Sequence, residues 1–227
     1  VALAAIGSLF EDLMGKYREL EHVVDYLQQL RDDLVDNVDA FRSEQGQDGA
    51  RDRSDLRLPL GSPHPLDRYR VNVLISHQDG KGAPVVYETN PTIEQLTGEI
   101  EHVAVMGALL TDFTMIEPGA LHKANGGYLV LEARSILTKP FAWEALKRAL
   151  KSAQIRPESV REHIGLLSTL TLDPEPIPLS VKVVLIGTPL IYYLLHDLDE
   201  DFRKLFKVKA DFATEFDCTE LPMPKEA

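Results

Sequence analysis

The N-terminal part of the chain shows a hydrophobic pattern typical of helices. Apolar residues recur mostly at alternating steps of three and four from Leu3 to Phe41, a spacing that places them on one face of a helix. The stretch is long for one helix, and Gly15 followed by Lys16 suggests a break, so we predict two helices or one kinked helix. Residues 1–45 then form a long helical arm. This arm either packs against a neighbouring core or helix, or binds a regulatory partner.

Residues 46–67 show neither helical nor strand periodicity. Glycines and prolines collect there among charged residues, at Gly46, Gly49, Pro59, Pro63 and Pro65. Such a composition buries too little apolar surface to fold by itself. We predict a flexible linker that separates the helical arm from a second unit, residues 68–227.

The pattern in residues 68–227 alternates between short apolar strands and helices. Strands are predicted over Tyr69–Ser76, Val85–Glu88, Tyr128–Leu131, Val181–Ile186 and Val208–Phe212. Helices are predicted over 93–96, 119–124, 142–152, 190–195 and 201–206. Buried strands flanked by helices are typical of an α/β fold. The predicted fold class is therefore α/β, with a mainly parallel sheet preceded by the helical arm.

Composition and charge narrow the class of protein. The 227 residues carry a net charge of −12, which argues against a surface that neutralises nucleic-acid phosphates. No apolar stretch is long enough to cross a bilayer, so no membrane partner is expected. The single cysteine, Cys218, can form no internal disulfide, which favours a reducing, cytoplasmic setting. The sequence begins at Val1, and we interpret the chain as a piece of a longer protein.

Several motifs of stand-alone hydrolases are absent from the sequence. No GxxxxGK[ST] loop is present to wrap a phosphate chain, and no GxSxG segment marks a serine nucleophile. The HExxH and CxxC patterns of zinc sites are absent too, and the seven histidines are scattered. No catalytic residue for peptide hydrolysis is therefore predicted within this chain.

The segment from Pro118 to Arg134, PGALHKANGGYLVLEAR, carries the most informative pattern. Its apolar strand runs directly into Glu132. An acid at the carboxyl end of a buried strand faces the crevice in which α/β domains bind nucleotides, and it can hold Mg²⁺ directly or through water. Glu132 is therefore a candidate Walker B acid and metal ligand. A surface glutamate that simply follows a core strand is the alternative.

The order of segments around Glu132 resembles that of AAA+ ATPases, especially their Lon-related, LonB-like branch. The resemblance rests on IEQLTG at 93–98, GALHKANGG at 119–127, FAWEALKRAL at 141–150, VKVVLIGT at 181–188 and DFRKLFKV at 201–208. It covers roughly Tyr69 to Phe212. It implies a partial AAA+ core that uses ATP and Mg²⁺, preceded by the end of a helical insertion.

The same resemblance implies what the intact protein contains and does. The Walker A loop would lie upstream of Val1, and a Ser-Lys peptidase domain would lie beyond Ala227. Copies of the protein would form a ring that binds ATP between subunits and threads unfolded protein substrates into a peptidase chamber.

Two positions depart from the pattern of the family. The family at large ends this strand with Asp-Glu, in which the Asp holds the metal and the Glu polarises the attacking water, whereas this sequence has Glu132-Ala133. Sensor 1 is usually Asn, and the nearest polar residue here is Thr188, whose hydroxyl either orients a water or caps the next helix.

Two further candidates follow from the resemblance. Arg203 is the candidate arginine finger, which would stabilise charge on a neighbour's γ-phosphate, with a surface or interface cation as the alternative. The loop from Val103 to Met115 is unusually apolar and corresponds to a loop that grips polypeptide in the ring pore. Its pore-loop candidates are Met106, Leu109, Leu110 and Phe113. A hairpin packed in the core is the alternative for this loop.

Two functions of different classes fit these observations. The first is the ATPase module of a Lon-related ATP-dependent serine protease, which couples ATP binding to threading and proteolysis in the intact protein. The second is a non-catalytic AAA-like scaffold for oligomerisation and protease gating, which Glu132-Ala133 favours. A DNA-remodelling AAA+ machine is a third, and the acidic balance counts against it.

Overall fold

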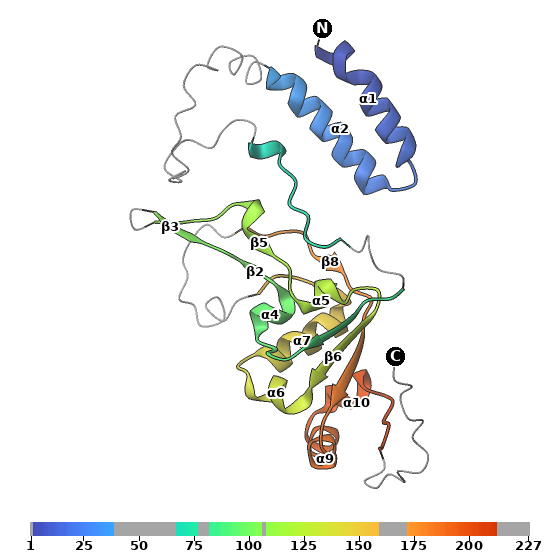
Figure 1. Cartoon of the computed structure of the whole chain (residues 1–227), viewed down its shortest axis with the longest axis vertical. Helices are drawn as coiled ribbons and strands as arrows, with labels where there is room; N and C mark the ends of the chain where they lie inside the picture. The colour runs from blue at the N-terminus through green and yellow to red at the C-terminus, as the bar shows by residue number, and fades with distance from the viewer. Residues whose placement is uncertain (1, 39–66, 77–81, 106–107, 159–171, 213–227) are drawn as a thin grey trace, which may run out of the picture. The chain divides into compact units, whose positions relative to one another are not determined.

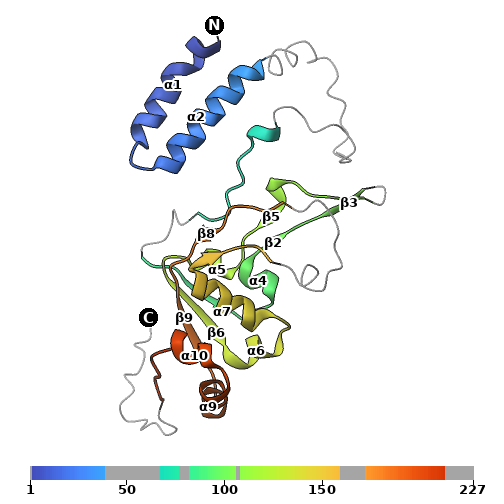
Figure 2. The ribbon, with the colours of Figure 1, turned by 180° about the vertical axis from the view of Figure 1, so that it is seen from behind.

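The computed structural model describes residues 2–38, 67–76, 82–105, 108–158 and 172–212. The chain separates into two compact units, an N-terminal unit, Val1–Val71, and a C-terminal unit, Asn72–Ala227 (Figures 1 and 2). The predicted linker, 46–67, lies outside the described residues except for Asp67.

The N-terminal unit contains a hairpin of two helices, α1 (Ala2–Lys16) and α2 (Glu21–Asp36). The hydrophobic pattern predicted two helices or a kinked one, and two are found, with the break at residues 17–20. The helices pack against each other, and Phe10 and Leu27 are buried.

A short 3₁₀ helix, η2 (Asp67–Tyr69), is tied to α2 through one carboxylate. The Tyr69 hydroxyl donates to Asp33 Oδ2 (2.7 Å), and the Arg68 guanidinium donates to Asp33 Oδ1 (2.8 Å). Asp33 therefore joins segments that lie far apart in the sequence.

A three-stranded parallel sheet forms the centre of the C-terminal unit, in the order β1 (Val85–Glu88), β6 (Tyr128–Glu132), β9 (Lys182–Ile186). Tyr128 pairs in register with Val85 on one side and Lys182 on the other, so the three strands start level. Their carboxyl ends consequently meet at one edge of the sheet. The predicted α/β fold with a parallel sheet is confirmed.

Helices cover one face of this sheet. They are α4 (Ile93–Thr97), α5 (Ala120–Lys123), α6 (Ala133–Thr138), α7 (Ala142–Ser152), α9 (Pro189–Leu198) and α10 (Glu200–Leu205). Helix α7 packs against α4, α6 and α10 (Figure 1). Leu129 and Leu131 of β6 have no exposed surface and join Trp143 and Leu146 of α7 in one apolar core.

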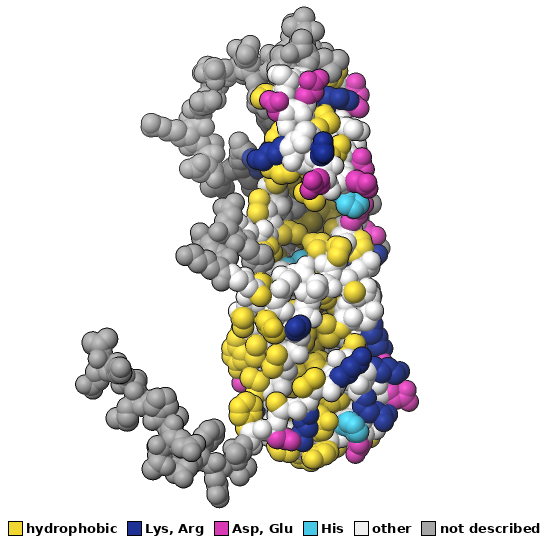
Figure 3. Space-filling view, turned by 90° about the vertical axis from the view of Figure 1, so that its right-hand side faces the viewer, with side chains coloured by type: hydrophobic (Ala, Val, Ile, Leu, Met, Phe, Trp, Pro, Cys, Tyr) yellow, Lys and Arg dark blue, Asp and Glu magenta, His cyan; other side chains and the backbone are white. Residues whose placement is uncertain are grey.

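The opposite face of the sheet is open among the described residues of this unit. The side chains at alternate positions point there, and Val85, Tyr87, Tyr128, Val184 and Ile186 are between 39% and 68% exposed. The view in Figure 3 shows hydrophobic side chains spread over much of the C-terminal unit. Glu132 belongs to this open face by the same alternation.

Short antiparallel ribbons extend the unit beyond the sheet. Between α4 and α5, β2 (Glu99–Ile100) pairs with β5 (Ile116–Glu117), and β3 (Val103–Val105) pairs with β4 (Ala108–Leu110). A 3₁₀ helix, η3 (Phe113–Met115), precedes β5. A third ribbon joins β7 (Gln154–Ile155) to β8 (Ile177–Pro178). The β3–β4 ribbon points away from the three-stranded sheet in both views (Figures 1 and 2).

Two of the predicted strands are wrong. Residues 70–76 form no strand, and Asn72 instead fastens this segment by donating to the carbonyls of Phe113 (3.0 Å) and Ile116 (3.1 Å). Residues 208–212 form no strand either, and Val208 is 90% exposed. Alternating apolar residues form a strand only where a neighbouring strand satisfies the backbone groups, and neither segment has such a neighbour among the described residues.

Asn125 fastens the turn before β6 to the segment that leads into β9. Its side-chain amide donates to the carbonyl of Pro178 (2.9 Å), and its side-chain oxygen accepts from the N–H of Ser180 (2.8 Å). The N–H of Gly126 donates to the carbonyl of Ser180 (2.8 Å). One side chain thus extends the pairing of β6 and β9 beyond the strands themselves.

We expect Asn125→Ala to lower the free energy of unfolding by about 1–2 kcal/mol, because two hydrogen bonds to backbone groups are lost. The comparison variant is Asn125→Asp, which keeps the acceptor for Ser180 but sets a carboxylate oxygen against the Pro178 carbonyl, so it should lose stability at neutral pH and regain part of it when the carboxyl is protonated. Urea unfolding followed by circular dichroism measures both variants. An unchanged stability in Asn125→Ala contradicts this role.

Candidate functional site

The carboxyl ends of β6 and β9 bring two of the predicted site residues to one edge of the sheet. Glu132 ends β6 and pairs in register with Ile186 of β9. Thr188 follows two residues later, at the start of α9. Both side chains are exposed. This is the edge at which α/β domains with parallel sheets bind their ligands.

Two neutral hydroxyl groups hold the carboxylate of Glu132. The Tyr87 phenol donates to Oε1 (2.9 Å), and the Ser135 hydroxyl donates to Oε2 (3.1 Å). Tyr87 belongs to the neighbouring strand β1 and Ser135 to the first turn of α6, so the two contacts come from different elements. The hydrogen bond to Glu132, together with burial and the carboxylate charge, raises the pKa of the Tyr87 phenol.

The surroundings of Glu132 suit a cation. No lysine or arginine pairs with it in the described part of the chain, and each oxygen keeps a lone pair beyond the hydroxyl that it accepts. Mg²⁺ takes one or two carboxylates and completes its shell with waters and phosphate oxygens. The described residues contain no group of three or more His, Cys, Asp or Glu that could hold a metal alone. A metal at Glu132 therefore needs ligands from a nucleotide or water.

Ala133 directly follows Glu132, where the sequence resemblance predicts the position of the family's water-polarising glutamate. Ala133 is 4% exposed, and its Cβ lies 3.1 Å from the place where a Cβ on Gly187 would stand. The position is therefore closed and apolar. Glu88, at the end of β1, is another acid at this edge, and its Oε1 accepts from the N–H of Asn90 (2.8 Å).

Thr188 occupies the N-cap position of α9, but its side chain makes no capping hydrogen bond. Of the two roles considered for its hydroxyl, capping is therefore absent from the structure. Thr188 is exposed at the edge that also carries Glu132.

Arg203 lies on α10, and its side chain is exposed. No ion pair with Arg203 is found within the described ranges. Helix α10 packs against α7 and α9, so Arg203 stands on the helical layer and not at the end of a sheet strand.

Asp199 caps α10 and ties it to α7. Its Oδ1 accepts from two backbone N–H groups in the first turn of α10. Its Oδ2 accepts from Trp143 Nε1 (2.8 Å) and from the buried Lys147 Nζ (2.9 Å). Burial opposes the charge of Asp199, but the hydrogen bonds from Lys147, Trp143 and the backbone lower its pKa from 3.8 to about 2. This network fixes the helix that carries Arg203.

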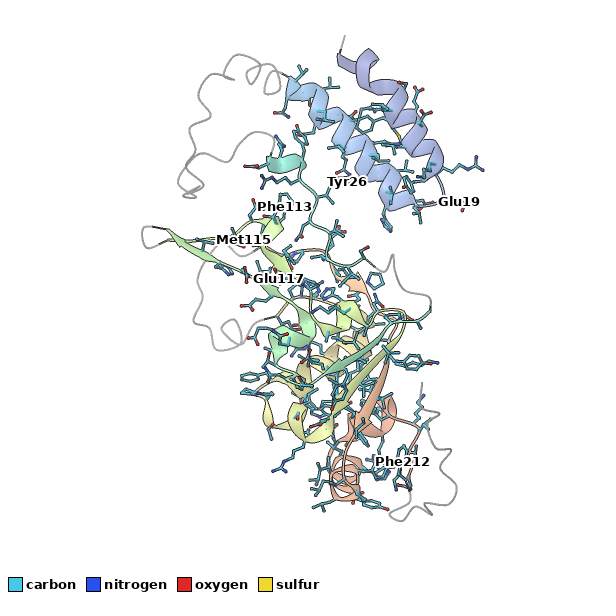
Figure 4. The ribbon with its side chains drawn as sticks, viewed as in Figure 1. Glu19, Tyr26, Phe113, Met115, Glu117 and Phe212 are labelled. Carbon is cyan, nitrogen blue, oxygen red and sulfur yellow. The ribbon has the colours of Figure 1, made fainter. Side chains whose placement is uncertain are left out.

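The pore-loop candidates are only partly described. Met106 lies outside the described residues, and Leu109 and Leu110 belong to β4, whose side chains are not described. Phe113 begins η3 and is half-buried, close to Met115 and Glu117 along the chain (Figure 4). The backbone of the loop forms the β3–β4 hairpin.

The segment between α4 and α5, which contains the β2–β5 and β3–β4 ribbons, is anchored at its end to α5. The N–H of Gly119 donates to Nδ1 of the buried His122 (3.2 Å), and burial lowers the pKa of that ring. A Cβ on Gly119 would lie 2.4 Å from the carbonyl oxygen of Leu96, so the two segments approach as backbones. The two ends of the segment between α4 and α5 are therefore held together where they join the core.

A groove of about 580 Å³ follows β9, which the sequence did not predict. Val184 and Ile186 of β9 line it together with Tyr192 and Leu195 of α9, and residues 208–212 line it as well. Along one edge β9 pairs with β6, and along the other it pairs with no described strand. The groove therefore combines an unpaired strand edge with apolar walls.

Sequence reasoning also missed both partners of Glu132. Tyr87 lies on the same face as Glu132 because it pairs with Val130, a register that the sequence does not reveal. Ser135 had a local signal, since side chains three residues apart at the start of a helix lie close together.

These features define an α/β domain with an acid at the carboxyl edge of a parallel sheet, the edge at which such domains bind their ligands. Residues 81–213 match the family model described as "LonB-like, AAA domain", which is more than half of the chain. The chain belongs to this LonB-like AAA domain family. The predicted relationship to Lon-related AAA+ proteins is confirmed.

Two further proteins are similar to parts of this chain. It is 31% identical over 72 residues to the "Putative Lon protease homolog" of Escherichia coli (strain K12), a match that covers 32% of this chain and 12% of that protein. A crystal structure of NtrX from Brucella abortus aligns over 56% of this chain and 26% of its own, at 18% identity and a TM-score of 0.36. Within the described ranges, no helix is both long and apolar enough to cross a bilayer.

Proposed function

We propose that this chain is part of the ATP-driven motor of a Lon-related protease, and that it couples ATP binding to the threading of unfolded proteins towards a peptidase. One observation carries the proposal: Glu132 stands at the carboxyl edge of the central strand with its charge uncompensated by any described cation. Membership of the LonB-like AAA domain family supports a nucleotide at this edge.

The groove along β9 supports the proposal that another part of the intact protein supplies the phosphate-binding loop. The unpaired edge of β9 can accept a strand through main-chain hydrogen bonds. A strand added parallel to β9 would end at the edge that carries Glu132 and Thr188. A Walker A loop following such a strand would complete a nucleotide site with these residues.

Each residue has a separate task in the proposed site. Bound Mg²⁺ would neutralise charge on the phosphates, and Glu132 would hold it. The uncapped hydroxyl of Thr188 would orient a water. Arg203 would act on the nucleotide of a neighbouring copy, which requires a ring. The β3–β4 ribbon would grip the substrate through Met106, Leu109, Leu110 and Phe113.

Ala133 favours a second candidate, a non-catalytic AAA-like scaffold that sets oligomer geometry or gates a protease. The position of the water-polarising glutamate is buried and apolar, so hydrolysis needs another residue for that step. A scaffold that does not hydrolyse ATP needs no such residue.

Nucleotide binding and hydrolysis by the intact protein, beside its Glu132→Gln variant, test the proposal. We expect the intact protein to bind and hydrolyse Mg²⁺-ATP. Because Glu132→Gln removes the metal-side charge, we expect the Mg²⁺ concentration for half-maximal ATP binding to rise about tenfold and turnover to fall.

The matched control is Glu88→Gln, which neutralises an acid at the same edge, one strand away and on the other face. It should leave the Mg²⁺ requirement unchanged. If the folded intact protein binds no nucleotide, the motor is excluded and the scaffold remains.

A further inference from the structure

We infer that Tyr87 is a positioning residue for the metal-side acid: its phenol holds the carboxylate of Glu132 in the orientation that receives the cation. The inference rests on the proposed role of Glu132. It assigns to Tyr87 a task that neither the sequence pattern nor the family relationship indicates.

The register of the sheet places the two side chains together. Tyr87 pairs with Val130, so it shares a face with Glu132, two residues further along the neighbouring strand. The phenol reaches diagonally across the strands to Oε1, at 2.9 Å. Tyr87 is 51% exposed and Glu132 is exposed as well, so close packing does not restrict the carboxylate. Its orientation therefore depends on its hydrogen bonds.

Glu132 needs such contacts because of its length. A glutamate has one more rotatable bond than the aspartate that is usual at this position, and ordering that bond costs entropy when a metal binds. The phenol of Tyr87 on Oε1 and the hydroxyl of Ser135 on Oε2 restrict the carboxylate before the metal arrives. The conformational cost is thus met in the folded protein.

The chemistry of Tyr87 fits this task better than a cationic partner would. A lysine or arginine at the same place would neutralise Glu132 and compete with Mg²⁺, whereas a neutral phenol donates a hydrogen bond and leaves the negative charge in place. A phenol is protonated at neutral pH and can donate, and the hydrogen bond to Glu132 raises the pKa of Tyr87 further. A side chain that only packed at this position would need no hydroxyl, so the hydrogen bond to Glu132 is the contribution specific to tyrosine.

The Tyr87→Phe variant of the intact protein tests the inference, with Tyr128→Phe as the matched control. Tyr128 lies on the same open face, and its hydroxyl has no hydrogen-bond partner in the described part of the chain. Loss of one hydrogen bond to the carboxylate should raise the Mg²⁺ concentration for half-maximal ATP binding about fivefold in Tyr87→Phe. We expect no change in Tyr128→Phe, and little change in turnover at saturating Mg²⁺ in either variant.

A double-mutant cycle separates positioning from a general structural effect. In a Glu132→Asp background the shorter carboxylate no longer reaches the phenol, so adding Tyr87→Phe should change the Mg²⁺ requirement no further. A fivefold effect that persists in that background would overturn the inference.

Absorbance titration of the tyrosinates gives a readout that needs no nucleotide. Tyr87→Phe should remove a phenol from the late, high-pH end of the titration. If the intact protein binds ATP but Tyr87→Phe has the same Mg²⁺ requirement as Tyr128→Phe, Tyr87 does not position Glu132 and the proposed function still stands. If the wild-type protein binds no nucleotide, the proposed function and this inference both fail.

Discussion

Asp199→Ala is expected to lower the free energy of unfolding of the C-terminal unit by about 3 kcal/mol. The substitution leaves the charge of Lys147, a residue only 6% exposed, with Glu144 as its remaining partner in the described structure. It also removes the acceptor of Trp143 Nε1 and the side-chain cap of α10. A buried cation that loses its main partner costs far more than a surface pair contributes.

The same residue predicts how stability depends on pH. The pKa of Asp199 is about 2 in the folded chain against 3.8 for the free side chain, although its burial acts in the opposite direction. Because the folded value is the lower one, the carboxylate contributes about 2 kcal/mol of stability above pH 4, and this is lost as the pH falls towards 2. The wild-type chain should therefore lose more stability over this window than Asp199→Ala does.

Asp197→Ala is the matched control for both measurements. Asp197 lies two residues away on α9, its side chain is 74% exposed, and it pairs with the exposed His196 at 3.1 Å. Its removal should change the free energy of unfolding by less than about 0.5 kcal/mol. Denaturant unfolding at pH 7, 4 and 3 measures the three proteins. Equal losses for the two variants would contradict the assigned network.

Gly127→Ala is expected to destabilise the C-terminal unit by about 3 kcal/mol or to prevent its folding. A Cβ at this position would lie 2.0 Å from the carbonyl oxygen of Pro84 and 2.8 Å from its ring, so the backbone would have to move. Movement is costly because the N–H of Tyr128 donates to Pro84 and the Gly127 carbonyl accepts from the N–H of Lys182. All three sheet strands begin at this junction.

The neighbouring Gly126 separates steric overlap from backbone strain. Gly126 has a φ of +82°, but no atom lies within 4 Å of its Cβ position. Gly126→Ala should therefore cost only about 1–2 kcal/mol, the penalty of a left-handed backbone with a side chain. Thermal and urea unfolding of both variants give the comparison. A larger loss in Gly126→Ala than in Gly127→Ala would refute the steric argument.

Elements with local signals could be predicted from the sequence. The helix over 142–152 was predicted with the bounds that the structure gives α7, because its apolar face repeats at helical spacing. The strand predicted over Val181–Ile186 is β9 with one residue fewer. The strands predicted over 69–76 and 208–212 failed, because an apolar alternation does not say whether a partner strand is present.

The residues of the candidate site likewise separate into those with a local sequence signal and those that depend on which strands are neighbours. Glu132 could be chosen because it directly follows an apolar strand, and Thr188 through the resemblance of its segment; the structure brings both to one edge. Tyr87 and the groove along β9 could not be found, because both depend on which strands are neighbours and in what register. Arg203 was chosen from its segment alone, and its effect on a nucleotide remains a prediction.

The strand order β1-β6-β9 also bears on how the chain folds. The strands begin at Val85, Tyr128 and Lys182, so each pairing must close a long loop. The chain therefore loses conformational entropy before the strands can form hydrogen bonds. The α1–α2 hairpin needs only a short turn and can form early. During synthesis β1 and β6 must wait for β9 to be made before the sheet is complete. The apolar strands are unprotected in that interval, which makes this chain a candidate for chaperone assistance.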